Sequence, residues 1–463
     1  KAVIRELGKV FGLPKEEIDA LSKDTAMSIQ YNHLAQLVMK YAQYIHGFPS
    51  HLSVHSSGII ISEKPIQHFS ATFLPPKGYP TVQFDMHVSE DVGLFKFDIL
   101  SQRGLSKIKE ALDIIAVNHQ SPDGSVPKID IHDMKRFKND ERMKGLLREA
   151  KAIGCFYIES PAMRMLLRKL QVDNYLGLVA ASSVIRPGVA KSGMMSEYIR
   201  RYRDPKRRKD AHPVLLKLMP ETYGVMVYQE DVIKVAHHFA GLTLGEADKM
   251  RRGMSGKFRS REEFQAVKEK FFTNCIEEKG HSIELTTEVW RQTESFAGYA
   301  FAKGHSASYA VESYQCLFLK TYYPLEFMVA TINNYGGFYS TELYVHEAEK
   351  LGAKIHAPCV NNSDVMTSIS GVIIHIGFHL IRSFDHKMGV AIVEERLKNG
   401  VYLHLNDFLE RVPIGQEQLM LLIRMDSFRC MGVDKRVLLW EAHLKGGKLA
   451  NPYPSADLFR VAP

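Results

Sequence analysis

The chain has few cysteines and no long apolar run. Its 463 residues include five cysteines, Cys155, Cys275, Cys316, Cys359 and Cys430, and no CxxC pair. This spacing argues against a zinc ribbon or a disulfide scaffold and is typical of reduced thiols in the cytoplasm. No apolar run approaches the roughly 18 residues that a membrane helix needs. No signal peptide opens the chain either. We therefore expect a cytoplasmic protein with no membrane partner.

The composition is that of a globular protein with a basic bias. Hydrophobic residues make up 45% of the chain and charged residues 24%, and the formal net charge is +8. A positive balance favours a polyanionic partner, although the charge of a whole chain is a weak argument. The stretch from Arg186 to His212 is more informative, because it contains nine Lys or Arg residues and only three Asp or Glu residues. For Pro205–Lys209 alone, a solvated loop is as good an interpretation as a binding surface.

The spacing of apolar residues predicts a mostly helical α+β protein. Helical periodicity covers most of the first fifty residues, and the β-branched run Ile59–Ile61 predicts a buried strand. A second strand is expected at Gly93–Leu100, where Lys96 and Asp98 share one face. A charged pair on an otherwise apolar strand is either salt-bridged or functional, and the residues alone leave both possibilities open.

Two arginines mark the end of a helix in the middle of the chain. Residues 225–240 predict a helix that Gly241 closes, and Thr243 with Glu246 forms a capping box that opens the next helix. Arg251 and Arg252 end that second helix. They could simply satisfy its dipole. Adjacent helical residues point in different directions, so we expect at least one of the two arginines to be free to reach a ligand.

A second basic helix end lies downstream. The sequence Ala302-Lys-Gly-His-Ser306 precedes an expected helix that runs to about Tyr322. Ser306 is the expected N-cap, and Lys303 and His305 lie beside the unpaired N–H groups of a helix N-terminus. This pattern makes an anion site a candidate, although a capping serine without a ligand is the commoner case.

Several motifs, in order along nearly the whole chain, resemble the bacterial DNA polymerase III alpha subunit, a C-family polymerase. They are AVIRELGKVFGL, HLSVHSSGIIIS, QFDMHVSEDVGLFKFDIL, IGCFYIESPAMR, IRPGVAKSGM, TYGVMVYQEDV, EADKMRRGMSGK and FAGYAFAKGHSASYA. Spellings such as HLSVHSSG and FAKGHS favour error-prone relatives of the replicative enzyme. The resemblance implies the end of the palm helix and the thumb at 1–50, a palm segment at 51–103 and fingers at 104–337. A helix-hairpin-helix-type domain at 338–448 and a tail at 449–463 follow.

The family's activity is DNA-directed DNA synthesis with two Mg²⁺ ions held by three palm aspartates. By its place in KFD, Asp98 would be the third of these metal ligands and a catalytic residue, with Lys96 facing the same site. Primer-template DNA and a dNTP are the implied partners. The resemblance and the local charge imply that the nucleotide is bound by Arg186, Tyr228, Gln229, Arg251, Arg252, Lys257, Lys303, His305 and Ser306.

The chain also departs from the family pattern. The other two aspartates lie upstream of AVIR in the family, in a motif that this sequence does not contain, and the amino-terminal phosphoesterase-like domain is absent too. We therefore expect this polypeptide to bind DNA and nucleotide without polymerising alone, and metal-dependent extension of a primed template by it would contradict this. In the expected hairpin Ile376–Asp385, Ser383 and Asp385 replace small or glycine residues, which puts phosphate contact in doubt.

The tail offers a candidate sliding-clamp peptide. Ala456-Asp-Leu-Phe459 resembles the family's clamp-binding sequence, with Leu458 and Phe459 as apolar anchors and Ser455 in place of the usual glutamine. A short apolar pair in a tail is more often incidental, so both interpretations stay open.

Two other function classes compete with a polymerase portion. The first is a non-catalytic DNA-binding module that shares the fingers architecture, and the paired palm aspartates in the native reading frame would distinguish the two. The second is an RNA-binding protein, which is disfavoured because no RNP-like aromatic strand pattern is present.

Overall fold

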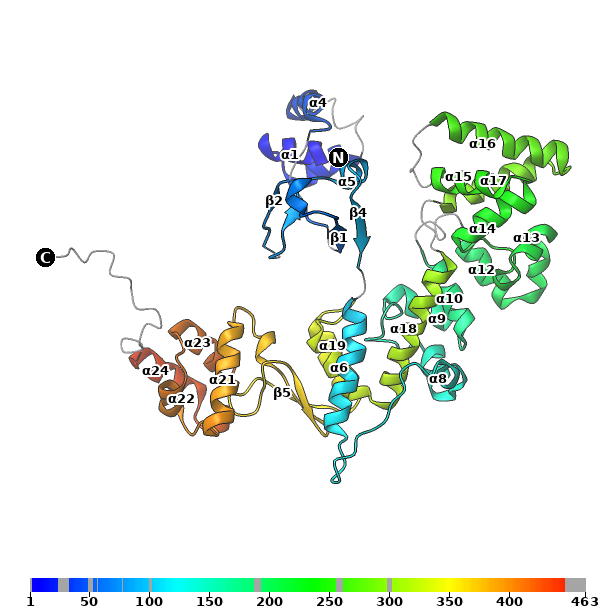
Figure 1. Ribbon diagram of the computed structural model, residues 1–463. Helices are drawn as coiled ribbons and strands as arrows, with labels where there is room; N and C mark the ends of the chain where they lie inside the picture. Colours follow the sequence, from blue (N-terminus) through cyan, green and yellow to red (C-terminus); the bar gives the residue numbers. More distant parts are fainter. Residues whose placement is uncertain are drawn as a thin grey trace. The chain divides into compact units, whose positions relative to one another are not determined.

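The computed structural model describes residues 2–23, 33–48, 53–55, 57–76, 78–99, 102–186, 193–254, 261–297 and 302–445. The chain divides into two compact units, Lys1–Leu100 and Ser101–Pro463. Figure 1 labels the elements of both units, and each unit is described by itself. In the described ranges no helix is long and apolar enough to cross a membrane.

The first unit is a small helical cluster followed by two short antiparallel strand pairs. Leu13, Ile18, Leu21, Ala35 and Val38 form the core between its helices. Strand β1 pairs with β4 and strand β2 pairs with β3. The bounds are α1 Ala2–Val10, α2 Lys15–Lys23, α4 His33–Ile45, β1 Gly58–Ile61, β2 Thr72–Phe73, β3 Thr81–Val82, α5 Met86–Asp91 and β4 Phe95–Asp98.

A strand forms at Ile59–Ile61 as predicted, but the prediction that it is buried is wrong, because none of its residues is buried. Ile59 and Ile61 are 49% and 61% exposed, and their register partners Phe97 and Phe95 are exposed as well. The reason is that the described part of this sheet has two strands, so one of its faces packs against nothing in the unit. Burial of a β-branched run depends on a covering layer, and local sequence does not specify that layer.

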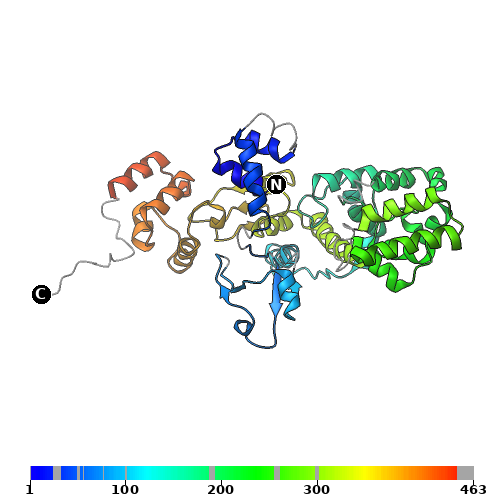
Figure 2. The same ribbon diagram turned by 90° about the horizontal axis from the view of Figure 1, so that it is seen from above.

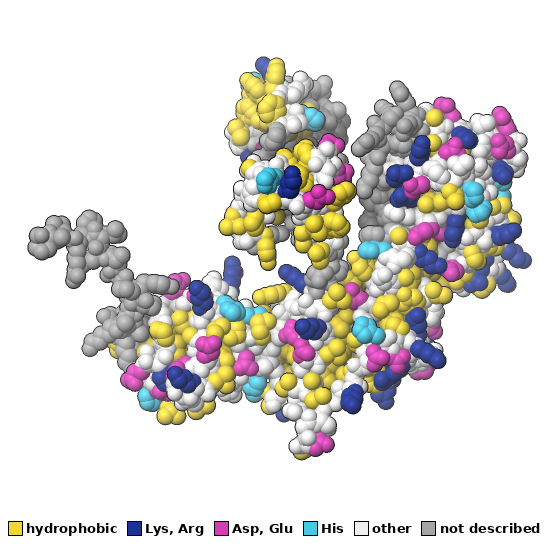
Figure 3. Space-filling view, viewed as in Figure 1, with side chains coloured by type: hydrophobic (Ala, Val, Ile, Leu, Met, Phe, Trp, Pro, Cys, Tyr) yellow, Lys and Arg dark blue, Asp and Glu magenta, His cyan; other side chains and the backbone are white. Residues whose placement is uncertain are grey.

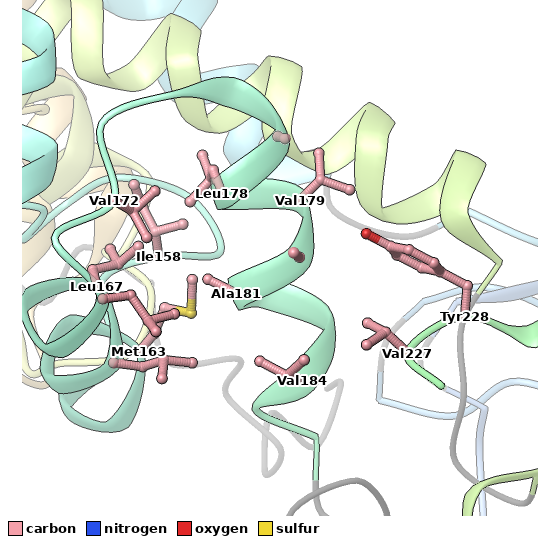
Figure 4. Packing of buried hydrophobic residues seen from close by; sticks show 14 of the residues in the cluster. Ile158, Met163, Leu167, Val172, Leu178, Val179, Ala181, Val184, Val227 and Tyr228 are labelled. Carbon is pink, nitrogen blue, oxygen red and sulfur yellow. The ribbon is translucent and has the colours of Figure 1, made fainter. Parts of the chain in front are cut away.

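The second unit is built around the long helix α18, Lys303–Tyr322, whose second half is almost entirely buried. It packs against α6, α7, α8, α10 and α19. Figure 4 shows the apolar contacts around α10, with Leu167 and Val172 on one side and the ring of Tyr228 directed toward Val179 on the other. The surrounding helices are α6 Gln102–Asn118, α7 Met134–Asn139, α8 Glu141–Arg148, α9 Pro161–Leu170, α10 Tyr175–Val184 and α19 Pro324–Asn333.

A group of helices between residues 194 and 297 carries Gln229, Arg251 and Arg252, three of the residues that the sequence singles out. Helix α15 packs against α14, α16 and α17, and Figure 2 shows the helices of this group side by side. Their bounds are α12 Met194–Arg203, α13 Pro213–Leu218, α14 Gln229–Lys234, α15 Leu244–Met254, α16 Arg261–Thr273 and α17 Ile283–Ala297. The predicted capping box is confirmed, because Thr243 Oγ1 accepts from Glu246 N at 3.3 Å and Glu246 Oε2 accepts from Thr243 N at 2.9 Å.

The C-terminal part combines a three-stranded sheet with a second hydrophobic core. Strand order is β5-β7-β6, with β5 parallel and β6 antiparallel to β7. Buried side chains such as Phe378, Tyr402, Phe408 and Phe428 hold the last helices together. The bounds are α20 Thr341–Lys350, β5 Lys354–His356, β6 Ser368–Ser370, β7 Ile373–His375, α21 His386–Asn399, α22 Leu405–Arg411, α23 Gln416–Arg424 and α24 Lys435–Lys445. The mostly helical α+β prediction is thus confirmed.

Candidate nucleotide and nucleic-acid sites

Lys96 and Asp98 project from the same face of β4, as predicted. The Lys96 ammonium lies 3.0 and 3.1 Å from the two carboxylate oxygens of Asp98. Gly58, the register partner of Asp98 on β1, leaves room for this pair, because a Cβ there would lie 3.0 Å from both the Lys96 and the His55 side chains. The strand therefore presents a salt-bridged pair that is still accessible to solvent.

His55 completes this small cluster without adding a positive charge toward Asp98. Its Nδ1 accepts hydrogen bonds from Ser57 N at 3.2 Å and Gly58 N at 2.7 Å. A ring nitrogen that accepts carries no proton, so the 3.8 Å approach of Nδ1 to Asp98 is not an ion pair. His55 acts as a structural residue that shapes the turn into β1.

The described residues of this face supply one carboxylate, which does not make a Mg²⁺ site by itself. Mg²⁺ prefers several oxygen ligands in octahedral geometry, usually one or two carboxylates together with waters and phosphates. Within the described ranges, no group of three or more His, Cys, Asp or Glu residues could hold a metal ion. The chemistry of Asp98 fits a single ligand position, and no catalytic step of this chain follows from it.

In the second unit, the start of α14 brings together residues from three helices. Asp231 caps α14, accepting from Val227 N and Tyr228 N at 2.9 Å each. This cap fixes Tyr228, Gln229 and Glu230 at the helix entrance. Tyr228 is 4% exposed, and burial raises the pKa of its hydroxyl. A buried hydroxyl with a raised pKa is poorly suited to act as an acid or a base.

Arg251 and Arg252 share one carboxylate, which corrects the expectation that one of them would be free. Arg251 Nη2 lies 2.8 Å from Asp248 Oδ1, and Arg252 Nη2 lies 2.9 Å from Asp248 Oδ2. The hydrogen bond from Arg251 holds the pKa of Asp248 below its ordinary value. Spacings of three and four residues place all three side chains on one helical face. Arg251 Nη1 also reaches Gln229 Oε1 at 3.4 Å, which joins α15 to α14.

Lys303 connects the N-terminus of α18 to the start of α14. Its backbone N–H donates to both oxygens of Glu230 at 3.0 Å, and its ammonium is paired with Glu221. The ammonium also lies 5.6 Å from the centroid of the Tyr228 ring. The N-terminus of α18, where the sequence predicts an anion site, therefore holds a carboxylate from another helix.

The assignment of Ser306 as the N-cap of α18 is wrong. The helix begins at Lys303 after Ala302, which lies in an extended conformation. Ser306 is 0% exposed and accepts a 2.8 Å hydrogen bond from Ser183 of α10. Glu230 already satisfies the first donor of the helix, so no capping hydroxyl is needed there. Ser306 packs α18 against α10 and has no open path to a nucleotide.

Arg186 and His305 belong to an aromatic cluster beside the first turns of α18. Arg186 Nη2 bonds to the Tyr157 hydroxyl. Tyr157 packs against Tyr309 with ring centroids 4.9 Å apart, and His305 lies 4.3 Å from Tyr309. Burial lowers the pKa of the Arg186 guanidinium and raises that of the Tyr157 hydroxyl. The structure thus brings Arg186 and His305 together through two tyrosines.

Sequence reasoning missed the carboxylates of this site. Asp248 could have been found, because it stands three and four residues before the two arginines. Glu221 and Glu230 meet Lys303 across 82 and 73 residues of chain, and no local pattern signals such a contact. Figure 3 shows Asp and Glu side chains interspersed with Lys and Arg over this group of helices. Lys257 lies outside the described residues.

The expected hairpin before α21 has a backbone turn typical of glycine at Ser383, where φ is 62°. Its amides are already engaged. Asp385 N donates to Gln418 Oε1 at 2.8 Å, and Asp385 Oδ1 accepts from Lys387 N at 2.9 Å. The Asp385 carboxylate therefore sits at the N-terminus of α21, where a phosphate would otherwise bind.

Comparison with known families divides the chain into three successive segments. Three family models match in order along the chain. The "Bacterial DNA polymerase III alpha NTPase domain" covers residues 1–101, and the "Bacterial DNA polymerase III alpha subunit finger domain" covers residues 104–279. The "Helix-hairpin-helix motif" covers residues 352–438. The chain belongs to the bacterial DNA polymerase III alpha-subunit family.

Curated relatives include DNA polymerase III alpha subunits and error-prone DNA polymerases. The DNA polymerase III subunit alpha of Pasteurella multocida (strain Pm70) is 33% identical over 446 residues, 89% of this chain and 37% of that protein. The corresponding subunit of Aquifex aeolicus (strain VF5) is 30% identical over 433 residues, 92% of this chain and 36% of that protein. An error-prone DNA polymerase of Bdellovibrio bacteriovorus (strain ATCC 15356 / DSM 50701 / NCIMB 9529 / HD100) is 28% identical over 464 residues, 95% of this chain and 43% of that protein. The chain thus spans about two fifths of the length of these relatives.

We expect Asp385→Asn to strengthen the binding of duplex DNA. Asparagine keeps the oxygen that caps α21, and the change removes a negative charge from the place where a phosphate would lie. Affinity should rise about threefold at low salt, and the gain should shrink as salt screens the charge. Fluorescence anisotropy with a labelled duplex measures this. Asp434→Asn, the same change at the entrance of α24, is the control, and equal affinities of all three proteins would show that the hairpin does not contact DNA.

Proposed function

We propose that this chain forms the dNTP-binding and DNA-binding portion of a DNA-directed DNA polymerase that acts in the bacterial cytoplasm. The family membership supports this reaction class. Within the chain, the observation that carries the proposal is the junction of α14, α15 and α18, where Arg251 contacts Gln229, Lys303 lies over the ring of Tyr228, and Arg252 shares Asp248 with Arg251. Phosphoryl transfer depends mainly on positioning and on stabilising negative charge, so three convergent cations suit a triphosphate.

Each residue would have a distinct part in this site. Arg251, Arg252 and Lys303 would bind the phosphates, with Lys257, Arg186 and His305 as further nucleotide contacts. Tyr228 and Gln229 would form the wall of the nucleotide pocket. The carboxylates of Glu221 and Asp248 pair with these cations, and the Glu230 carboxylate accepts from the backbone N–H of Lys303, so a triphosphate would take their place. Ser306 would act only indirectly, by fixing α18 against α10.

Other contacts of the whole polymerase extend this proposal. Asp98 would provide one Mg²⁺ ligand beside Lys96, and magnesium would stabilise the attacking and leaving oxygens of nucleotidyl transfer. The helix-hairpin-helix part would contact primer-template DNA. Leu458 and Phe459, which lie outside the described residues, would bind a sliding clamp. Unchanged clamp affinity after Leu458→Ala with Phe459→Ala would rule that peptide out.

The test of the nucleotide site is the effect of Glu230→Gln on dATP binding. A phosphate must compete with the Glu230 carboxylate for the Lys303 amide, and glutamine removes the competing charge while keeping an acceptor oxygen. We expect the dissociation constant of dATP to fall about tenfold, which corresponds to about 1.4 kcal/mol. Isothermal titration calorimetry on the chain measures this change.

A matched control separates this effect from a general change in charge. Glu284→Gln removes one carboxylate from the first turn of α17, and Glu284 contacts none of the three cations. Its dATP affinity should equal that of the unaltered chain. Equal affinities of the Glu230 and Glu284 variants would remove the α18 N-terminus from the proposed site.

A further inference from the structure

Two cysteines far apart in sequence meet in the helix-hairpin-helix part of the chain. The segment after β5 and the segment after α23 are held together by several bonds, including Val360 N to Ser427 O at 3.0 Å. Arg429 Nη1 also donates to Pro358 O at 2.8 Å. These contacts place Cys359 beside Cys430. The pairing is set by the buried core of this part and not by a flexible surface loop.

The two thiols contact each other and share a polar environment. Asn361 Nδ2 donates to Cys430 Sγ at 3.3 Å and also to Tyr402 O at 2.9 Å, which fixes the amide between the two segments. The hydrogen bond from the Cys430 thiol lowers the pKa of Cys359, and the backbone N–H groups of Asn361 and Asn362 and the charge of Arg429 act in the same direction. The pair therefore stabilises one thiolate and one thiol.

The two cysteines differ in their exposure to solvent. Cys359 is 2% exposed, whereas Cys430 is exposed to solvent. The same hydrogen bond raises the pKa of Cys430, so the thiolate rests on the buried Cys359, and the exposed sulfur gains negative charge only when its proton passes to Cys359 along that bond. A small oxidant can thus reach Cys430, and the buried Cys359 remains in contact with it.

The other three cysteines differ from this pair in exposure and in pKa. Cys155, Cys275 and Cys316 are each 0% exposed. Burial raises the pKa of all three thiols, to about 11 for Cys275 and for Cys316. Reactive cysteines are accessible and have thiolate character, and buried protonated ones are inert. In the Cys359 and Cys430 pair, Cys359 supplies the thiolate character and Cys430 supplies the access to solvent.

We propose that Cys359 and Cys430 form an oxidation site, which a peroxide converts into an intramolecular disulfide. As its proton passes to the Cys359 thiolate, the Cys430 sulfur attacks one oxygen of hydrogen peroxide, so that an S–O bond forms, the O–O bond breaks and hydroxide leaves. The sulfur of Cys359 then attacks the Cys430 sulfenic acid, so that the S–S bond forms and the S–O bond breaks. Overall, two thiols lose two electrons and two protons, and the peroxide is reduced to two molecules of water.

The disulfide would tie the β5 side of this part to the connection between α23 and α24. It closes a loop of roughly 70 residues, and a cross-link over a loop of that size removes much conformational freedom from the unfolded chain. The helix-hairpin-helix part should therefore melt several degrees higher in the oxidised protein than in the reduced protein. Thiol reductants should reverse the change.

The test is mass spectrometry of the 463-residue chain treated with one equivalent of hydrogen peroxide and then alkylated without reduction. We expect a cross-linked peptide pair containing Cys359 and Cys430, two hydrogens lighter than the sum of its peptides, while Cys155, Cys275 and Cys316 keep free thiols. Cys430→Ser, an exposed and mild change, should abolish the cross-link. Oxidation of Cys430 to a sulfinic acid without a cross-link, or reaction spread equally over all five cysteines, would overturn the proposal.

Discussion

Replacing Arg251 and Arg252 together with alanine is expected to weaken dATP binding about 100-fold, which corresponds to about 2.7 kcal/mol. Each arginine can make charge-assisted hydrogen bonds to a phosphate, and such bonds contribute roughly 1.5–3 kcal/mol. In the unaltered chain part of this binding free energy is offset, because both arginines must first release Asp248. In the double variant Asp248 remains unpaired and repels the nucleotide, which adds to the loss.

Arg291→Ala is the matched control for this double variant. Arg291 pairs with Glu288 on α17 at the same three-residue spacing and at 2.7 Å, but it contacts none of the residues assigned to the nucleotide. Its removal should leave the dATP dissociation constant unchanged. Calorimetric titration of the three proteins at one ionic strength compares them directly, with a thermal melt of each to show that it is folded. Equal dATP affinities in the double variant and the control would contradict the assignment.

The second large effect concerns Glu312 in the middle of α18. Its side chain is buried at 8% exposure, and its Oε1 has no hydrogen-bond partner among the described residues. Burial raises the pKa of this carboxyl to about 7 from an ordinary 4.5. Space around it is tight, because a Cβ on Gly104 of α6 would lie 1.9 Å from Oε1.

This raised pKa gives a stability that depends on pH in a definite direction. The folded state binds the Glu312 proton more tightly than the unfolded chain does, so the group imposes no cost below about pH 4.5. The cost grows as pH rises toward 7 and is then constant, at about 3 kcal/mol for a shift of this size. Glu312→Gln should remove most of that dependence, so at pH 8 it should raise the free energy of unfolding by about 2 kcal/mol, allowing for an unpaired amide.

The measurement is urea unfolding at pH 5 and pH 8 for the unaltered chain, Glu312→Gln and Glu342→Gln. Glu342 is exposed on α20, so its variant should follow the unaltered chain at both pH values. The increase in the free energy of unfolding caused by Glu312→Gln, relative to the unaltered chain, should be larger at pH 8 than at pH 5. An equal effect of Glu312→Gln at both pH values would show that the carboxyl is already charged at the lower pH and that its pKa is not raised.

Local patterns predicted the elements that local forces determine. The capping box of Thr243 and Glu246 begins α15, and the helix from Lys303 ends at Tyr322, just before Pro324. Period-two alternation correctly placed Lys96 and Asp98 on one face of β4. In each case the deciding contacts lie within a few residues of chain.

Two of the three incorrect predictions have a different physical origin, and the third missed a contact that is local in the sequence. Ser306 was expected to cap α18, but the first donor of that helix is satisfied by Glu230, 73 residues away. At least one of Arg251 and Arg252 was expected to be free, yet Asp248, three and four residues earlier in the same helix, pairs with both. The run Ile59–Ile61 was expected to be buried, and only tertiary packing decides whether a strand face is covered. Long-range contacts of this kind leave no mark in local spacing.

The most direct test of the nucleotide site compares dATP with dAMP in calorimetric titrations of the unaltered chain. Both ligands carry the same base and sugar, so their difference in affinity reports the phosphates that Arg251, Arg252 and Lys303 would bind. We expect dATP to bind at least about 100-fold more tightly than dAMP at low salt, with the difference shrinking as salt rises. Equal affinities for the two nucleotides, or binding of neither, would contradict a triphosphate site at the junction of α14, α15 and α18.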